Sequence, residues 1–176
     1  MKNLIIAFGL SIVAFSTNAQ HNHSQHTTTP QQQKQPEKNT AISANEQVQQ
    51  LYNHYIGIKD ALVTGNQKEA ASHANKLSQT ASLISYRDLS EGNINALRKD
   101  ASTIADAKDL AAQRKAFSNL SNNMSALAEK FKLSDKTVYQ QYCPMAKGYW
   151  LSNEKEIRNP YYGSSMLTCG SLKKTL

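Results

Sequence analysis

The sequence predicts a mainly α-helical domain: an up-and-down four-helix bundle with an irregular or short-stranded C-terminal cap. Three observations support this fold class. Apolar residues recur at spacings of three and four through residues 43–131, turn and capping residues divide that region into four stretches, and the period stops in the segment 134–176. Short connections favour antiparallel neighbours, which is why an up-and-down bundle is expected.

Residues 1–19 have the pattern of a secretory signal peptide. Lys2 precedes an apolar run of twelve residues from Leu4 to Phe15, and small residues end at Ala19, where a signal peptidase would cut. A membrane span needs about twenty apolar residues, and no second apolar stretch follows. No cysteine lies near the cleavage site to carry a lipid anchor. We therefore expect a protein exported to the periplasm, or secreted, with no membrane span after cleavage.

Residues 20–42 are predicted to form a disordered tail rich in Gln, His, Thr and Pro. The stretch has almost no apolar side chains, so burial cannot offset the entropy of ordering it. His21, His23 and His26 lie close together in it. Short His-rich tracts bind Cu(II), Zn(II) or Ni(II) through imidazole, but such a tail can also serve only as a solubilising linker.

The rest of the chain, residues 43–176, is long enough for one domain with its own core. Ser43 and Glu46 have capping-box spacing, Gly65 stops the first helix, and Asn66 with Glu69 repeats the cap spacing for the second. The four helices are expected at about 43–63, 67–86, 91–106 and 108–131.

Later breaks delimit the third and fourth helices. Ser90 and Gly92 interrupt the pattern before the third, and either Asp106 or Asp109 can cap the fourth. Arg114 interrupts the apolar face of the fourth helix, which suggests a buried ion pair with an acid such as Asp60 or Asp88.

Charge and composition exclude several function classes. Lys and Arg total 20 against 13 Asp and Glu, but they are scattered along helical patterns rather than gathered with aromatics. We therefore expect no nucleic-acid binding. His54 and His73 are far apart in sequence and have ordinary helical neighbours, no Cys-x-x-Cys is present, and nothing places a base near either thiol. We expect no enzymatic activity.

The segment 134–176 holds both cysteines, the only tryptophan and five of the eight tyrosines. Cys143 with Met145, and Met166 with Cys169, each offer a thiol and a thioether over a short span. These soft donors select Cu(I) or other soft ions. Pro144 stiffens the first pair, and Gly170 allows a tight turn after the second.

A disulfide is the competing interpretation of the cysteines. Two cysteines in an exported protein are often paired, because the periplasm is oxidising. Closing the 27-residue loop between Cys143 and Cys169 would stabilise the fold by about 3.5 kcal/mol in chain-entropy terms. A pair that switches with redox state could bind metal only when reduced, so the two interpretations overlap.

Aromatic residues near the sulfur residues also have two interpretations. Tyr149, Trp150, Tyr161 and Tyr162 can shield a soft cation by cation–π contact, or can pack the cap against the helices. Packing is the commoner use of such residues.

A set of residues in the C-terminal segment forms one motif: Val138-Tyr139, Tyr142-Cys143-Pro144-Met145-Ala146, Gly148, Trp150-Leu151-Ser152, Ile157, Asn159-Pro160-Tyr161-Tyr162-Gly163, Met166 and Cys169-Gly170. The helices add Tyr52, Tyr55, Lys59-Asp60-Ala61-Leu62 and Gln113-Arg114 with Phe117. With these residues the chain resembles, over about residues 45–174, a domain family of unknown function. That family occurs in exported proteins of Bacteroidetes-type bacteria, alone or fused to CusB-type periplasmic adaptor subunits of heavy-metal efflux pumps.

The resemblance implies a periplasmic helical domain connected with copper, silver or related metal resistance. The Cys-Pro-Met element is also similar to the start of short metal-binding modules in such adaptors, where a His usually follows the Met. Ala146 stands at that place here. Only Cys143, Met145, Met166 and Cys169 are therefore expected as ligands.

These observations lead to two functional hypotheses. The first is a periplasmic protein that binds or shuttles a soft metal ion, with copper as Cu(I) foremost, and a heavy-metal efflux adaptor or another periplasmic protein as partner. The second is a disulfide-locked helical module that docks on an envelope or efflux partner and binds no metal.

Overall fold

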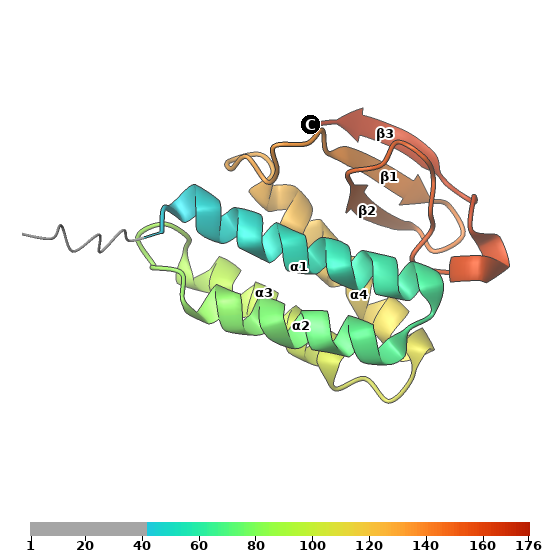
Figure 1. Ribbon diagram of the computed structural model, residues 1–176, viewed down its shortest axis with the longest axis horizontal. Helices are drawn as coiled ribbons and strands as arrows, with labels where there is room; N and C mark the ends of the chain where they lie inside the picture. The colour runs from blue at the N-terminus through green and yellow to red at the C-terminus, as the bar shows by residue number, and fades with distance from the viewer. Residues whose placement is uncertain (1–41) are drawn as a thin grey trace, which may run out of the picture. The chain divides into compact units, whose positions relative to one another are not determined.

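A computed structural model describes residues 42–176, and Figure 1 shows its arrangement. The predicted signal peptide and nearly all of the predicted tail, including His21, His23 and His26, lie outside the described residues. The described part is mainly α-helical, with four helices and a small three-stranded antiparallel sheet near the C-terminus. In this coarse form the predicted fold class is confirmed.

The first helix, α1 (Ala44–Thr64), begins and ends where the sequence predicts. The Ser43 hydroxyl accepts a hydrogen bond from the Glu46 amide, and the Glu46 carboxylate accepts one from the Ser43 amide, which completes the capping box. Gly65 ends the helix with φ 78°, a left-handed conformation that glycine adopts without steric cost.

Helix α2 (Gln67–Ser82) starts at the predicted cap but ends four residues before the predicted 86. The Asn66 side chain accepts a hydrogen bond from the Glu69 amide. Beyond Ser82, the carbonyl of Ser85 accepts hydrogen bonds from the amides of Asp88 and Leu89. The Ser85 hydroxyl also accepts a hydrogen bond from the Arg87 amide, so the turn replaces the helical hydrogen-bond pattern.

Helices α3 (Glu91–Ala105) and α4 (Leu110–Leu127) follow. Asp109, not Asp106, caps α4 by accepting a hydrogen bond from the Ala112 amide. The fourth helix was predicted to reach residue 131. It ends earlier because the amides of Lys130 and Phe131 both donate to the Leu127 carbonyl. The next amide, that of Lys132, donates to the Asn45 side chain instead of to a helical carbonyl.

The helices form two layers, and the sheet makes a third. Consecutive helices pack against one another, whereas the α1 and α4 backbones approach less closely and are bridged by aromatic side chains. Figure 1 shows the sheet lying over α1 and α4, with α2 and α3 on the opposite side. The predicted four-helix bundle topology is therefore not confirmed in detail, because the sheet contacts α1 and α4 where these two helices would otherwise pack closely against each other.

One apolar core runs from the helices into the sheet. It includes Leu77 and Leu97 from the layer of α2 and α3, Tyr55 and Phe117 from the layer of α1 and α4, and Trp150 from the sheet. The rings of Tyr55 and Phe117 stack with centroids 5.2 Å apart. The sheet is thus built on the same core as the helices, and its position is fixed by buried aromatic contacts.

The three strands are β1 (Tyr139–Cys143), β2 (Gly148–Ser152) and β3 (Ser171–Thr175), in the order β2-β1-β3. Strands β1 and β2 form a hairpin in which Cys143 is opposite Gly148. Strand β3 returns antiparallel on the other side of β1 after a short 3-10 helix, η1 (Gly163–Met166). The predicted short-stranded cap is therefore a three-stranded antiparallel sheet, with one register shift between Gln140 and Gln141 where β1 pairs with β3.

Within residues 42–176, none of the helices combines the length and apolar character that crossing a membrane requires.

Candidate functional site

Cys143 is the fully buried member of the predicted sulfur set. It is the last residue of β1, and the chain turns back immediately after it into β2. The turn is tight, since Lys147 has φ 51°, and it brings the Ala146 amide to 3.4 Å from the Cys143 sulfur. The sulfur thus accepts a backbone hydrogen bond from its own turn.

Asn159 connects the two cysteine-bearing segments. Its fully buried side-chain amide donates to the Cys143 sulfur at 3.2 Å and to the Cys169 carbonyl at 2.8 Å. Its side-chain oxygen accepts a hydrogen bond from the Tyr161 amide, and its backbone amide donates to the Leu167 carbonyl. One side chain therefore satisfies polar groups from three separate stretches of loop.

Cys169 lies beside Cys143, at the end of the return loop. Its amide donates to the Met166 carbonyl at 3.1 Å. Loss of solvation raises the pKa of the Cys169 thiol, and the charge and hydrogen bonding of Cys143 raise it further. The two thiols are close enough to interact, but both are free and lie beyond disulfide distance. The disulfide interpretation has no support in this form of the protein.

The two predicted methionine ligands are exposed, and each is close in sequence to one of the cysteines. Met145 is 61% exposed in the turn after Cys143, and Met166 is 37% exposed at the end of η1. Met124, by contrast, is fully buried in α4. The structure thus brings two thiols together and leaves one thioether near each in sequence. Residues 42–176 hold no cluster of three or more His, Cys, Asp or Glu suited to a metal, so a site here needs methionine sulfur or water as well.

Tightly packed glycines and aromatic residues support this loop. A Cβ on Gly170 would lie 2.8 Å from the Trp150 ring and 3.0 Å from the Tyr142 carbonyl, so only glycine fits there. Trp150 is buried edge-on to Tyr161, with ring centroids 6.1 Å apart, and Tyr161 packs against Phe117. The packing interpretation therefore holds for Trp150 and Tyr161.

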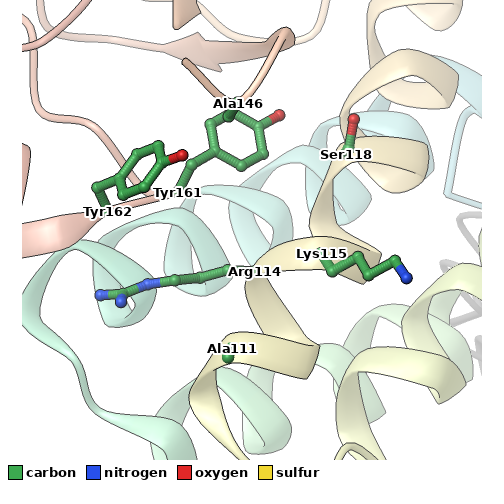
Figure 2. Close-up of a pocket in the computed structure, with 7 residues that line it drawn as sticks. All are labelled: Ala111, Arg114, Lys115, Ser118, Ala146, Tyr161 and Tyr162. Atoms are coloured by element: carbon green, nitrogen blue, oxygen red, sulfur yellow. The ribbon is translucent and has the colours of Figure 1, made fainter.

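A pocket of about 470 Å³ adjoins the turn that carries Cys143. Figure 2 shows that Arg114 and Lys115 extend from α4 in opposite directions, with the Tyr161 ring above them. The two cations do not converge on one point in the pocket, so they do not form a joint clamp for an anion. Ala146 and Tyr161 border both this pocket and the cysteine loop.

Arg114 has a structural role that differs from the expected one. Its guanidinium donates to the Leu62 carbonyl at 2.9 Å and makes no ion pair with Asp60 or Asp88. Leu62 lies in the last turn of α1, where carbonyls lack helical partners and a cation is favourable. Burial lowers the pKa of Arg114. The acid Asp60 pairs instead with the buried Lys59, at 2.7 Å.

Sequence reasoning missed two polar residues that build this region. The Asn159-Pro160 pair is typical of a turn, and this pattern carries no information on what the Asn159 side chain binds. Tyr55 falls in the apolar repeat of its helix, yet its hydroxyl accepts a hydrogen bond from the Leu151 amide at 2.9 Å and shares another with Ser121. This bond ties strand β2 to helix α1.

Comparisons with known proteins relate the helical part to a family without an assigned role. A family model described as protein of unknown function (DUF3347) matches residues 51–136. The match runs from α1 to just before β1 and stops short of Cys143. No curated protein and no solved structure matches the chain. The match agrees with the expected resemblance to a family of unknown function, whereas the bacterial origin and the link to efflux adaptors stay predictions.

Proposed function

We propose that this protein binds a soft metal ion, foremost Cu(I), through the sulfur residues of its C-terminal segment. The ligands are Cys143 and Cys169, with Met145 and Met166 completing the coordination. The observation that carries the proposal is that two free thiols lie near one another, with the buried Asn159 amide bonded to the Cys143 sulfur and to the Cys169 carbonyl. Thiolate and thioether sulfur favour Cu(I) over hard cations.

The surroundings of Cys143 suit a metal-bound thiolate. Two N–H groups, from Ala146 and Asn159, point at its sulfur. Donors of this kind orient a sulfur ligand and stabilise the negative charge that it keeps when it binds a metal. Met145 and Met166 are exposed and Cys169 is half-buried, so three of the four proposed ligands are accessible from solvent, whereas Cys143 is buried.

The cellular setting belongs to the same proposal. The predicted signal peptide places the protein in the periplasm, where copper enters from outside, and the resemblance stated above connects it with heavy-metal efflux. The role that fits is binding or shuttling of the ion, with an efflux adaptor or another periplasmic protein as partner. The proposed role is non-enzymatic, as the sequence predicts.

An anaerobic titration of the reduced full-length protein with Cu(I), against a competing chelator, tests the proposal. We expect one tight site that is lost when Cys143→Ser and Cys169→Ser are combined. Met145→Leu and Met166→Leu should each weaken binding. Met124→Leu is the matched control, because this methionine is buried in the core and a Leu of similar size fits there. Unchanged affinity in the double cysteine variant would contradict the site.

Proton release gives a second readout of the same site. A metal that binds the raised-pKa Cys169 thiol must displace its proton. Cu(I) affinity should therefore increase with pH in the wild type, and the dependence should weaken in Cys169→Ser. An affinity independent of pH would show that Cys169 is not a ligand.

Counting free thiols and bound metal in protein purified without reductant separates this function from the disulfide-locked alternative. Two free thiols with bound copper agree with the proposal. A Cys143–Cys169 bridge without metal would instead favour an interaction module, since oxidised sulfur is no longer a thiolate ligand.

A further inference from the structure

Two histidines that are distant in sequence meet on the surface between α1 and α2. The rings of His54 on α1 and His73 on α2 have centroids 6.1 Å apart and are tilted by 47°. The two helices are neighbours joined by the turn at Gly65 (Figure 1), which carries the chain back alongside itself. The imidazoles therefore face one another across the helix pair.

Gly57 makes this close approach feasible. A Cβ at this position would lie 2.4 Å from both Cε1 and Nδ1 of His73, so the ring rests directly on the backbone of α1. Gly57 is three residues after His54 and lies on the same helix face. A glycine within a helix lowers the stability of that helix. At this position the absence of a side chain leaves the space that the His73 ring occupies beside His54.

Among the residues that the structure describes, one nitrogen of the pair is buried without a partner. His73 Nδ1 is buried and makes no hydrogen bond, and neither imidazole takes part in an ion pair within residues 42–176. Burial lowers the pKa of His54, and the nearby His73 and Lys76 lower it further. A neutral imidazole is the form that binds metals.

We propose that His54 and His73 form a second metal site, which takes a borderline divalent cation of the Cu(II), Ni(II) and Zn(II) class. Two imidazole nitrogens supply the protein ligands, and water fills the remaining positions. Imidazole suits these ions, and a metal between the rings would give the buried His73 nitrogen the partner that it lacks. This site goes beyond the proposed sulfur site: it uses nitrogen ligands, lies on other elements and takes a different class of ion.

Titration of the full-length protein with Zn(II) tests the proposal, with the tail histidines His21, His23 and His26 replaced by Ala. Nuclear magnetic resonance of the imidazole rings reports each histidine separately, so binding at the thiols does not confuse the result. We expect the His54 and His73 ring signals to shift together with added Zn(II) and to saturate along one common binding curve. His54→Ala or His73→Ala should weaken this binding by at least about tenfold.

Gly57→Ala probes the geometry without removing a ligand. The added methyl group displaces the His73 ring, so Zn(II) binding should weaken about as much as when a ligand is lost. Gly92→Ala is the matched control, because a Cβ there meets nothing within 4 Å and the residue is also helical. Circular dichroism confirms that each variant keeps its helices.

Two results would overturn the proposal. One is Zn(II) saturation that leaves the His54 and His73 ring signals unshifted. The other is wild-type affinity at these rings in Gly57→Ala, since that variant cannot hold His73 in the same place. Neither result bears on Cu(I) binding by the sulfur residues, which stands or falls on its own titration.

Discussion

The helices and the C-terminal segment bury their residues by different means. Helix α2 presents a stripe of small and apolar side chains, such as Ala74 and Leu77, and its backbone bonds are satisfied inside the helix. The C-terminal segment instead uses buried amides. The Gln141 side-chain nitrogen lies within 3.2 Å of three consecutive carbonyls, those of Glu154, Lys155 and Glu156, which share its two N–H groups. Asn159 bonds both cysteine-bearing stretches.

This difference follows from how the backbone N–H and C=O groups of each region find hydrogen-bond partners. A helix pairs its own N–H and C=O groups, so its side chains have only to fill a core. A loop lacks that internal pairing, and side-chain amides must replace it wherever the loop is buried. Substitutions should therefore act through volume in the helices and through lost hydrogen bonds in the C-terminal segment.

Leu77→Ala should have the largest effect on stability and the smallest on the sulfur site. Leu77 is fully buried in α2, and its truncation leaves a cavity that costs about 2–5 kcal/mol. Urea unfolding measures the loss. Cu(I) affinity of the folded variant should match that of the wild type, because the cavity lies across the helix layers from the thiols. A matching loss of affinity would show that the two regions are not separable.

Asn159→Ala should cost less stability but should alter the site. The change leaves the Tyr161 amide and the Cys169 carbonyl without their partner, at about 1–3 kcal/mol for such unsatisfied buried groups. The expected signature is faster alkylation of Cys143 and weaker Cu(I) binding. Asn153→Ala is the control, since this half-exposed asparagine in the same segment bonds Thr137 and Ser134 instead. Equal effects of the two substitutions would contradict the role assigned to Asn159.

Ser43→Ala tests how local the helical stability is. The substitution removes one half of the capping box at the start of α1, which is exposed, and should cost about 1 kcal/mol. Urea unfolding detects this loss, and neither Cys143 reactivity nor metal affinity should change. Ser43→Asp should restore most of the stability, because Asp also caps helices well; failure of this rescue would argue against a capping effect.

A pH effect at His54 should be the smallest of the four. Its folded-state pKa is lowered, first by burial and then by His73 and Lys76. The folded protein therefore binds this proton less readily than the unfolded chain does. The stability linked to neutral His54 is present above about pH 6.5 and is lost as pH falls through the lower folded value. His54→Gln should lose less stability than the wild type between about pH 7 and pH 5.5, as measured by urea unfolding. A larger acid loss in the variant would reverse the assigned direction.

Local signals determined much of the helical region. The box at Ser43, the cap at Asn66 and the stop at Gly65 each act within about one turn of helix, so neighbouring residues suffice to predict them. The ends of α2 and α4 were predicted too late. Those ends depend on turn bonds at Ser85 and Leu127, which compete with a periodic pattern that continues beyond the last helical residue.

The sequence by itself also singled out the segment that carries the thiols, because rare residues are concentrated there. It could not decide whether the thiols come near one another, or that Asn159 bonds both cysteine residues. The two Asn159 contacts alone join residues 10 and 16 positions apart through loops with no period. The same holds for His54 and His73, which share a face only because α2 packs back on α1. Capping and periodicity are local and can be inferred from neighbouring residues. The contacts within each candidate site depend on how separate elements pack, and only the tertiary structure decided them.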